Sequence, residues 1–208
     1  MAILSIGNKI TTSHEEFERY KSSDSSKVLS DAKAVEDFSI ELSIGSQWAD
    51  DLSGDRAHLY KIESDSVAIK PGKSIVVEVE ESIRLPFNMY GIVLQTGSIF
   101  LEQGLIVGSG KIEPSYSGNL LLLIYNTSST TRRLKKGKKI ASAIFMRTDR
   151  TLVSSPIQPS REIVQKTLSK PKKLVRFLQR DWRFLITVIV SVLSSSVAAV
   201  LVQLLVEK

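Results

Sequence analysis

The chain has 208 residues, with 28 lysines and arginines against 22 aspartates and glutamates, a formal net charge of +6, and no cysteine. The absence of cysteine excludes disulfides, thiol catalysis and cysteine-ligated metals, and two histidines are too few for a histidine-built metal site, so no metal site is predicted. The positive surplus is local, because residues 1–160 hold nineteen charged groups of each sign, and nucleic acid is therefore not a predicted partner.

Residues 1–36 are rich in serine, lysine and glutamate and are predicted to form a short helix and a polar loop. The helix covers about residues 13–21. It opens with Ser13-His-Glu-Glu16, a capping box in which the serine hydroxyl and the glutamate satisfy free backbone N–H groups. We therefore expect His14 to be a solvated helical residue.

Residues 37–146 alternate short apolar runs with turn residues such as Pro71-Gly72 and Lys136-Gly137, which is typical of strands joined by tight turns. We expect a mainly β domain, a barrel or sandwich with one core. The predicted strands are 39–44, 66–69, 74–79, 90–94, 105–107, 119–125 and 139–145.

Residues 147–183 are predicted to be a linker and a basic helix next to a membrane. Two prolines in residues 154–159 indicate the linker, and the helix runs from about residue 160 to 179 with an interruption at Pro171. Residues 161–183 carry eight basic and two acidic groups. Such a basic segment is attracted to anionic headgroups, and Trp182 suits the membrane interface.

Residues 184–206 form an uncharged apolar run of twenty-three residues, which predicts a transmembrane helix. At about 1.5 Å per residue the helix is roughly 35 Å long, enough to cross a hydrocarbon core of roughly 30 Å. Because basic residues stay on the cytoplasmic side, we predict a single-pass, tail-anchored protein in the lipid bilayer, with its large N-terminal domain in the cytoplasm. The alternative is a buried helix of a soluble domain.

Small and polar residues recur at every fourth position of the apolar run, which places Ser191, Ser195, Ala199 and Gln203 on one helix stripe. Small residues allow helices to approach closely, and a glutamine amide that faces a partner helix avoids lipid. The stripe predicts association of the spans. The alternative is tolerated polarity in a monomeric anchor.

Four sequence motifs of the β region resemble the dCTP deaminase and dUTPase superfamily. They are Ser39-Ile-Glu-Leu-Ser-Ile-Gly45; Leu85-Pro86 with Gly91 and Gly104-Leu105; Ile112-Glu-Pro-Ser-Tyr-Ser-Gly118 with Tyr125-Asn126; and Leu134-Lys-Lys-Gly137 with Ile140-Ala141 and Phe145. The resemblance covers about half of the chain. It implies a distorted jelly-roll (dUTPase-like) β-barrel, and homotrimers whose active sites lie between subunits.

The chain departs from this family where the chemistry is expected. The family's phosphate-binding turn, Arg-Ser-Ser-Leu-Ala, aligns with Gly97-Ser-Ile-Phe-Leu101, and the second arginine of the deaminase version aligns with Glu102. The deaminase glutamate that shuttles protons aligns with Leu123. Leucine cannot move a proton, and Glu102 would repel a triphosphate.

The resemblance leaves a small set of candidate site residues. Glu113 is the one catalytic candidate if the protein is active, because it aligns with the dUTPase aspartate that orients the attacking water. The candidates for ligand binding are Ser98, Glu113, Tyr116, Gly118 and Asn126. No cofactor is predicted apart from Mg²⁺ if a nucleoside triphosphate is bound. The alternative is that these are turn residues that the fold requires.

A dense basic patch is formed by Arg132, Arg133, Lys135, Lys136, Lys138 and Lys139. It is interpreted as a solvated hairpin, as a contact to lipid headgroups, or as a phosphate-binding group.

The resulting hypothesis is a membrane-anchored, trimeric, catalytically degenerate protein of this superfamily. It would sense a nucleotide or cluster the spans of a membrane effector, and antiviral defence is the most specific version, by analogy of architecture alone. The competing hypothesis is an active membrane-tethered dCTP deaminase or dUTP diphosphatase in deoxynucleotide metabolism, with Glu113 as base.

Overall fold

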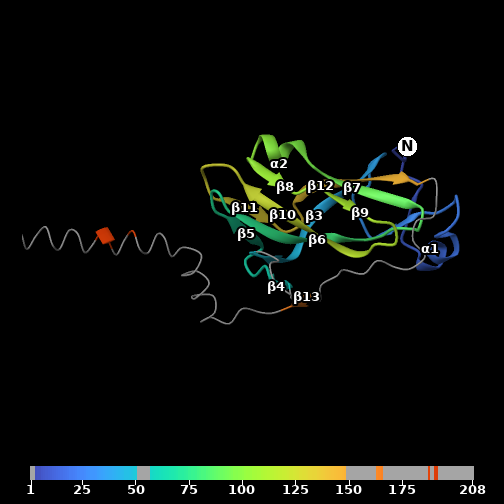
Figure 1. Ribbon diagram of the computed structural model, residues 1–208, viewed down its shortest axis with the longest axis horizontal. Coiled ribbons are helices and arrows are strands. Elements are labelled where there is room, and N and C mark those ends of the chain that lie inside the picture. Colours follow the sequence, from blue (N-terminus) through green and yellow to red (C-terminus); the bar gives the residue numbers. More distant parts are fainter. Residues whose placement is uncertain (1–2, 51–56, 149–162, 166–186, 188–189, 192–208) are drawn as a thin grey trace, which may run out of the picture. The chain divides into compact units, whose positions relative to one another are not determined.

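The computed structural model describes residues 3–50, 57–148 and 163–165, together with Thr187, Val190 and Ser191 (Figure 1). The described part is mainly β, as predicted. Its helices are α1 (His14–Tyr20) and α2 (Gly97–Leu101). Its strands are β1 (Ile10–Thr11), β2 (Val28–Ser30), β3 (Ser39–Ala49), β4 (Ala57–Lys61), β5 (Ser66–Ile69), β6 (Ser74–Arg84), β7 (Met89–Gln95), β8 (Leu105–Val107), β9 (Gly110–Ile112), β10 (Ser117–Asn126), β11 (Arg132–Lys135), β12 (Lys139–Arg147) and β13 (Ile163–Gln165).

Local sequence signals account for several of these elements. The side chain of Ser13 accepts a hydrogen bond of 3.2 Å from the backbone N–H of Glu16, which confirms one half of the predicted capping box. The other half is different, because the Ser13 N–H donates to the Thr11 hydroxyl at 3.0 Å and the Glu16 carboxylate accepts from Thr11 and Lys27. β5 and β8 have the predicted bounds, and the other predicted strands are longer than expected. Two segments differ from the prediction. Residues 97–101 form the short helix α2 where the sequence predicts a turn, and residues 163–165 form the strand β13 where it predicts a helix.

The segment predicted as helix and polar loop, residues 1–36, also contributes strands. β2 pairs antiparallel with β6 and parallel with β1, and Ile6 and Val28 are completely buried in the main core. The apolar run of β2 is too short to predict a strand on its own. Residues 28–30 become a strand because the edge of β6 offers backbone N–H and carbonyl groups with which they form hydrogen bonds.

The correction at β13 has a similar cause. Ile163 and Val164 are β-branched, and their strand pairs in parallel with β4, which itself pairs with β3.

Of the apolar run, Thr187, Val190 and Ser191 are helical and exposed. No helix among the described residues is long and apolar enough to cross a membrane. The remaining residues of the run, with Trp182, Ser195, Ala199 and Gln203, lie outside the described ranges, and the span stays a prediction.

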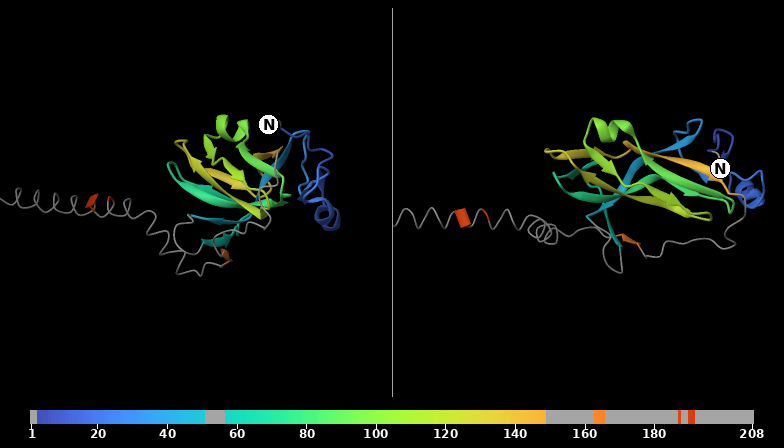
Figure 2. Two further views of the ribbon diagram at one scale, coloured as in Figure 1. Left: turned by 45° about the vertical axis from the view of Figure 1, so that its right-hand side comes forward. Right: turned by 45° about the horizontal axis from the view of Figure 1, so that its top comes forward.

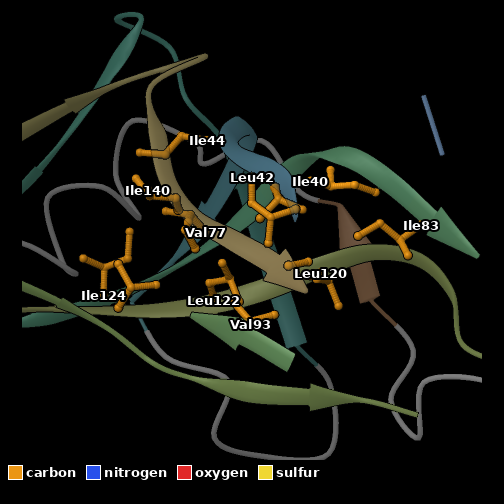
Figure 3. Packing of buried hydrophobic residues seen from close by; sticks show 14 of the residues in the cluster. Ile40, Leu42, Ile44, Val77, Ile83, Val93, Leu120, Leu122, Ile124 and Ile140 are labelled. Atoms are coloured by element: carbon orange, nitrogen blue, oxygen red, sulfur yellow. The ribbon is translucent and has the colours of Figure 1, made fainter. Parts of the chain in front are cut away.

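The strands enclose one main hydrophobic core. The hydrogen-bonded order β1-β2-β6-β3-β12-β7-β9 forms the larger sheet, to which β10, β8, β4 and β13 are joined, while β5 and β11 form a separate pair. Leu42, Val77, Ile124 and Ile140 lie at the centre of the core and are completely buried (Figure 3). The helix α1 and the β5–β11 pair lie at opposite ends of this domain in every view (Figures 1 and 2).

A bulge in β6 interrupts the pairing at the middle of the domain. β10 places Asn119 opposite Ser82 but Leu121 opposite Glu78, so three β6 residues face a single β10 residue. The Asn119 amide donates to the carbonyl oxygens of Val79 and Glu80, at 3.2 and 3.0 Å. These bonds satisfy backbone acceptors that the bulge removes from the ladder.

Two carboxylates complete the bulge from the other side. The Glu81 carboxylate accepts the backbone N–H of Ser43 at 2.8 Å, and the Asp31 carboxylate accepts that of Ser82 at 2.8 Å. The facing strand approaches so closely that a Cβ on Gly45 would lie 2.8 Å from the Glu78 carbonyl oxygen. Glycine is therefore required at position 45 for steric reasons.

The buried carboxyl of Glu81 makes stability depend on pH. Burial raises the pKa of Glu81 above its usual value of 4.5, although the Ser43 N–H opposes the shift. Because the folded protein then favours the protonated carboxyl, the stabilisation is complete below pH 4.5 and is lost as pH rises through the raised pKa. We expect Glu81→Gln to remove part of this pH dependence and to leave stability at pH 7 equal or higher. Urea denaturation of the full chain in detergent between pH 4 and 7 measures it, with Glu15→Gln on exposed α1 as control. A loss of stability that is equal at both ends of the range would contradict the assignment.

Candidate functional site

The predicted site residues fall into two groups at opposite ends of β10. Glu113, Tyr116 and Gly118 lie where β10 begins, in and after the turn that follows β9. Asn126 ends the strand, and Thr127 beside it bonds through its N–H and hydroxyl to the carbonyl oxygen of Gly104, close after α2, which carries Ser98. The ten residues of β10 separate the groups by roughly 30 Å. One chain does not bring the predicted residues into a single site.

The turn Glu113-Pro-Ser-Tyr116 is tight and strained. The N–H of Tyr116 donates to the Glu113 carbonyl oxygen at 3.1 Å, and Ser115 has φ of 68°. A proline followed by a residue with positive φ is the pattern of a type II turn, in which glycine or asparagine is preferred at the second central position. The Ser115 hydroxyl is buried and has no hydrogen-bond partner within the described structure.

The carboxylate of Glu113 is held by a cation of its own chain. It forms an ion pair with Lys111, a residue that the sequence motifs did not single out, and this pairing raises the pKa of Lys111. Both side chains remain accessible, at 37% and 64% exposure. The pair cancels the negative charge that Glu113 would present to a phosphate.

Tyr116 is a neutral hydrogen-bond donor. Its hydroxyl donates to the carbonyl oxygen of Asn119 at 2.9 Å, and its ring packs against the main core. Burial, with a smaller contribution from the negative charge of Glu78, raises the pKa of Tyr116 to about 12. Gly118 beside it has φ of 139°, a conformation that favours glycine. The β9–β10 turn is therefore a preformed element.

Asn126, predicted to bind ligand, is completely buried and bonded within its own chain. Its amide donates to the carbonyl oxygens of Ile69 and Thr130, both at 2.8 Å, and its oxygen accepts the N–H and hydroxyl of Ser128 at 2.9 and 2.7 Å. These four bonds use every polar position of the side chain. Asn126 anchors the loop that follows β10.

The helix α2 offers little to an anion. Ser98 and Glu102 are exposed, and the N–H of Glu102 donates to the Ser98 carbonyl oxygen at 3.2 Å. No arginine or lysine lies in α2 or in the two residues on either side of it. The Ser98 hydroxyl is left as the one side-chain donor of the helix.

An apolar surface covers the outer side of β10, and we call it the apolar face. Leu123 is 48% exposed and Tyr125 is 41% exposed, and Tyr125 lies opposite Ile106 of β8, which is 39% exposed. Leu101 of α2 is 79% exposed. Sequence reasoning did not identify this surface. Its signal is the unbroken run Leu120-Leu-Leu-Leu-Ile-Tyr125, because a strand that is apolar on both sides is normally covered on both.

Two pockets flank the β6 bulge. One has a volume of about 420 Å³ and is lined by Ser46, Glu78, Glu80, Asn119 and Lys136 among others. Burial alone raises the pKa of Glu78. The other pocket, about 260 Å³, contains Arg84, His14 and Ser117. Within the described ranges no three histidine, aspartate or glutamate side chains gather as metal ligands would.

Comparison with known proteins identifies clear relatives. Residues 13–148 match the profile of the family described as dCTP deaminase-like. A dCTP deaminase of Acinetobacter baumannii is 26% identical over 125 residues, 60% of this chain and 66% of that protein. A putative deoxyuridine 5'-triphosphate nucleotidohydrolase of Frog virus 3 is 29% identical over 72 residues, 35% of this chain and 44% of that protein.

A solved structure shares the fold. The 2'-deoxycytidine 5'-triphosphate deaminase of Agrobacterium tumefaciens superposes with a TM-score of 0.50 and 18% identity, over 69% of this chain and 47% of that one. The chain thus spans just under two thirds of the curated deaminase and about half of the solved one.

The strained turn yields a stability prediction. Ser115→Gly removes the left-handed strain, of roughly 1–2 kcal/mol, and an unpaired buried hydroxyl, but adds chain entropy of roughly 0.5–1 kcal/mol to the unfolded state. We expect a net stabilisation of about 1 kcal/mol, measured by urea denaturation of the full chain. Ser115→Ala keeps the strain and should stabilise less, and Ser117→Gly, whose φ is negative, should destabilise. Equal effects of the two glycine variants would contradict the strain at position 115.

Proposed function

Because this chain belongs to the dCTP deaminase-like family, we propose that it binds a deoxynucleotide without turning it over. The observation that carries the proposal is the exposed Leu123 on β10. The family resemblance places the proton-shuttling glutamate at this position, and leucine has no group that accepts or donates a proton. The missing arginines around α2 support the same conclusion, since a triphosphate would lack its charge-assisted contacts there.

The site forms between copies of the chain, which assemble as a trimer. Roughly 30 Å of β10 separates Ser98 from Glu113 in one chain, so both can contact one ligand only when they come from different copies. The apolar face supports this assembly, because its exposed side chains would be covered by a neighbouring copy. Lys111 joins the candidate ligand-binding residues, as the partner of Glu113.

The apolar run 184–206 anchors the trimer in a membrane, and the basic residues 161–183 keep the β domain on the cytoplasmic side. Three spans held together by the trimer would place Ser191, Ser195, Ala199 and Gln203 against one another. Nucleotide binding would then be communicated to a membrane effector, as in an antiviral sensor. Architecture alone supports this last step.

Nucleotide binding and turnover are measured together. The full chain in detergent is incubated with dCTP or dUTP and Mg²⁺, and ammonia release, pyrophosphate release and thermal unfolding are followed. We expect a higher unfolding temperature without product, because a ligand that binds only the folded state stabilises it, by roughly 2.7 kcal/mol at one hundred times Kd. ATP is the control ligand and should not raise the unfolding temperature. Ser98→Ala removes a candidate ligand-binding hydroxyl and should reduce the increase in unfolding temperature.

Two outcomes would replace the proposal. Steady release of product, abolished by Glu113→Gln, would assign the protein to deoxynucleotide metabolism as an active enzyme, with Mg²⁺ holding the phosphates. Neither product nor a thermal shift with any deoxynucleotide would leave a structural scaffold.

The assembly is tested at the apolar face. We expect the full chain in detergent to have the mass of three 23.1 kDa subunits and Ile106→Glu to dissociate it, because a carboxylate would be buried against a neighbouring copy. Mass measurement by light scattering, corrected for detergent, distinguishes the states. Phe38→Glu places the same charge on an exposed phenylalanine just before β3, a strand that pairs with neither β10 nor β8, and should leave the mass unchanged. A monomeric wild-type chain would contradict the trimer.

A further inference from the structure

The basic patch of the sequence is a single structural unit, which we call the basic hairpin. It comprises β11, the Lys136-Gly137 turn and the start of β12, residues 132–139, and six of its eight residues are arginine or lysine. The completely buried side chains of Leu134 and Ile140 fix it to the main core. The charged side chains are therefore carried by a rigid element.

The charges of the basic hairpin are not neutralised by neighbouring acids. Elsewhere, Arg19 pairs with Glu15, Lys33 with Glu80 and Arg84 with Glu18. In contrast, none of the six basic residues of the hairpin forms an ion pair within the part of the chain that the structure describes. Arg132 donates its Nε–H to the Ser128 hydroxyl at 3.1 Å. Without the six residues of the hairpin, residues 1–160 hold thirteen basic and nineteen acidic groups, so the hairpin concentrates positive charge in a region that is otherwise acidic.

Strand pairing keeps this charge accessible. Arg133 lies opposite Ala68 and Lys135 opposite Ser66 on β5, and these small residues do not cover the long basic side chains. Arg133, Lys135 and Lys139 are exposed. The hairpin lies at the end of the domain away from α1 (Figure 1).

The composition of the hairpin selects the kind of anion. Residues 127–139 contain no aromatic residue, whereas proteins that bind single-stranded nucleic acid combine basic grooves with aromatic side chains that stack on bases. Binding to phosphate headgroups requires only that positive charge lies close to the membrane surface. Each lysine or arginine near an anionic surface adds roughly 1 kcal/mol of attraction.

We propose that the basic hairpin binds the anionic lipid surface of a membrane and sets the orientation of the β domain against it. The inference rests on the proposed function in that the apolar run brings the domain to the membrane. A tethered domain meets the surface at a high effective concentration, so weak attractions at Arg133, Lys135 and Lys139 suffice to orient it.

The absence of cysteine makes the test direct, because a single introduced cysteine can carry a fluorophore. The full chain with Thr131→Cys, beside the hairpin, is reconstituted into phosphatidylcholine vesicles with or without phosphatidylglycerol, with quencher-labelled lipid in the outer leaflet. Ser22→Cys, after α1 at the other end of the domain, is the control label. We expect quenching at position 131 only, only with phosphatidylglycerol, and weaker at high salt.

Charge variants separate the hairpin from net charge. Arg133→Gln, Lys135→Gln and Lys139→Gln together should reduce the equilibrium constant for the quenched state on the order of a hundredfold, about fivefold for each residue. Lys9→Gln, Lys21→Gln and Lys33→Gln together change the net charge equally and should leave quenching intact. Lys136 is kept, because it also lines the pocket that holds Glu78 and Glu80.

The outcomes are distinct from those of the proposed function. Resistance of the chain to alkaline extraction from the vesicles reports the anchor, whatever the label does. Equal quenching in neutral and anionic vesicles, or equal loss in the two triple variants, would overturn the role of the hairpin. A label that responds to inorganic phosphate or to RNA but not to phosphatidylglycerol would also overturn it, and would assign the charge to a free anion or to nucleic acid.

Discussion

The bulge in β6 is the constraint on which the rest of the domain depends. β6 pairs with β2, β3 and β10, so a break in its ladder exposes backbone groups toward each of these neighbours. Side chains from distant segments satisfy them: Asp31 on one side and Asn119 on the other, with Glu81 reaching from the bulge itself to β3. The two pockets described above lie beside this bulge, and the Tyr116 hydroxyl donates to the carbonyl oxygen of Asn119. The bulge thus connects core, pockets and the β9–β10 turn in one hydrogen-bonded unit.

The same architecture keeps the two groups of candidate site residues apart within one chain. With ten residues, β10 is long enough to hold the β9–β10 turn and α2 at opposite ends, and its outer side presents the apolar face between them. Exposure of the apolar side chains of Leu123 and Tyr125 to water is unfavourable in free energy, and such a surface is typical of an interface with another protein chain. A neighbouring copy would cover these side chains and bring a second set of candidate residues to the first. Assembly and ligand binding are therefore coupled in the proposed function.

The charged groups of the domain matter more for the proposed function than for the stability of the fold. Surface pairs such as Arg19 with Glu15 contribute little to stability because both partners are solvated. The Glu113–Lys111 pair instead sets the charge of the candidate site. The basic hairpin, which forms no ion pair among the described residues, sets the charge of one end of the domain. If the domain is anchored as proposed, its strongly positive end would give it a preferred orientation on an anionic membrane.

Sequence alone determined the mainly β class, the cap of α1, the bounds of β5 and β8, and the family, because turn residues, capping boxes and short apolar runs act locally. It also offered turn residues as the alternative for Glu113 and Tyr116, and both lie in the turn before β10. Only tertiary structure decided that Val28 belongs to a strand, that Asn126 is internal to its own chain, and that Ser98 lies far from Glu113. These outcomes depend on contacts between backbone groups and surfaces that are far apart in the sequence, and local sequence patterns do not specify such long-range contacts.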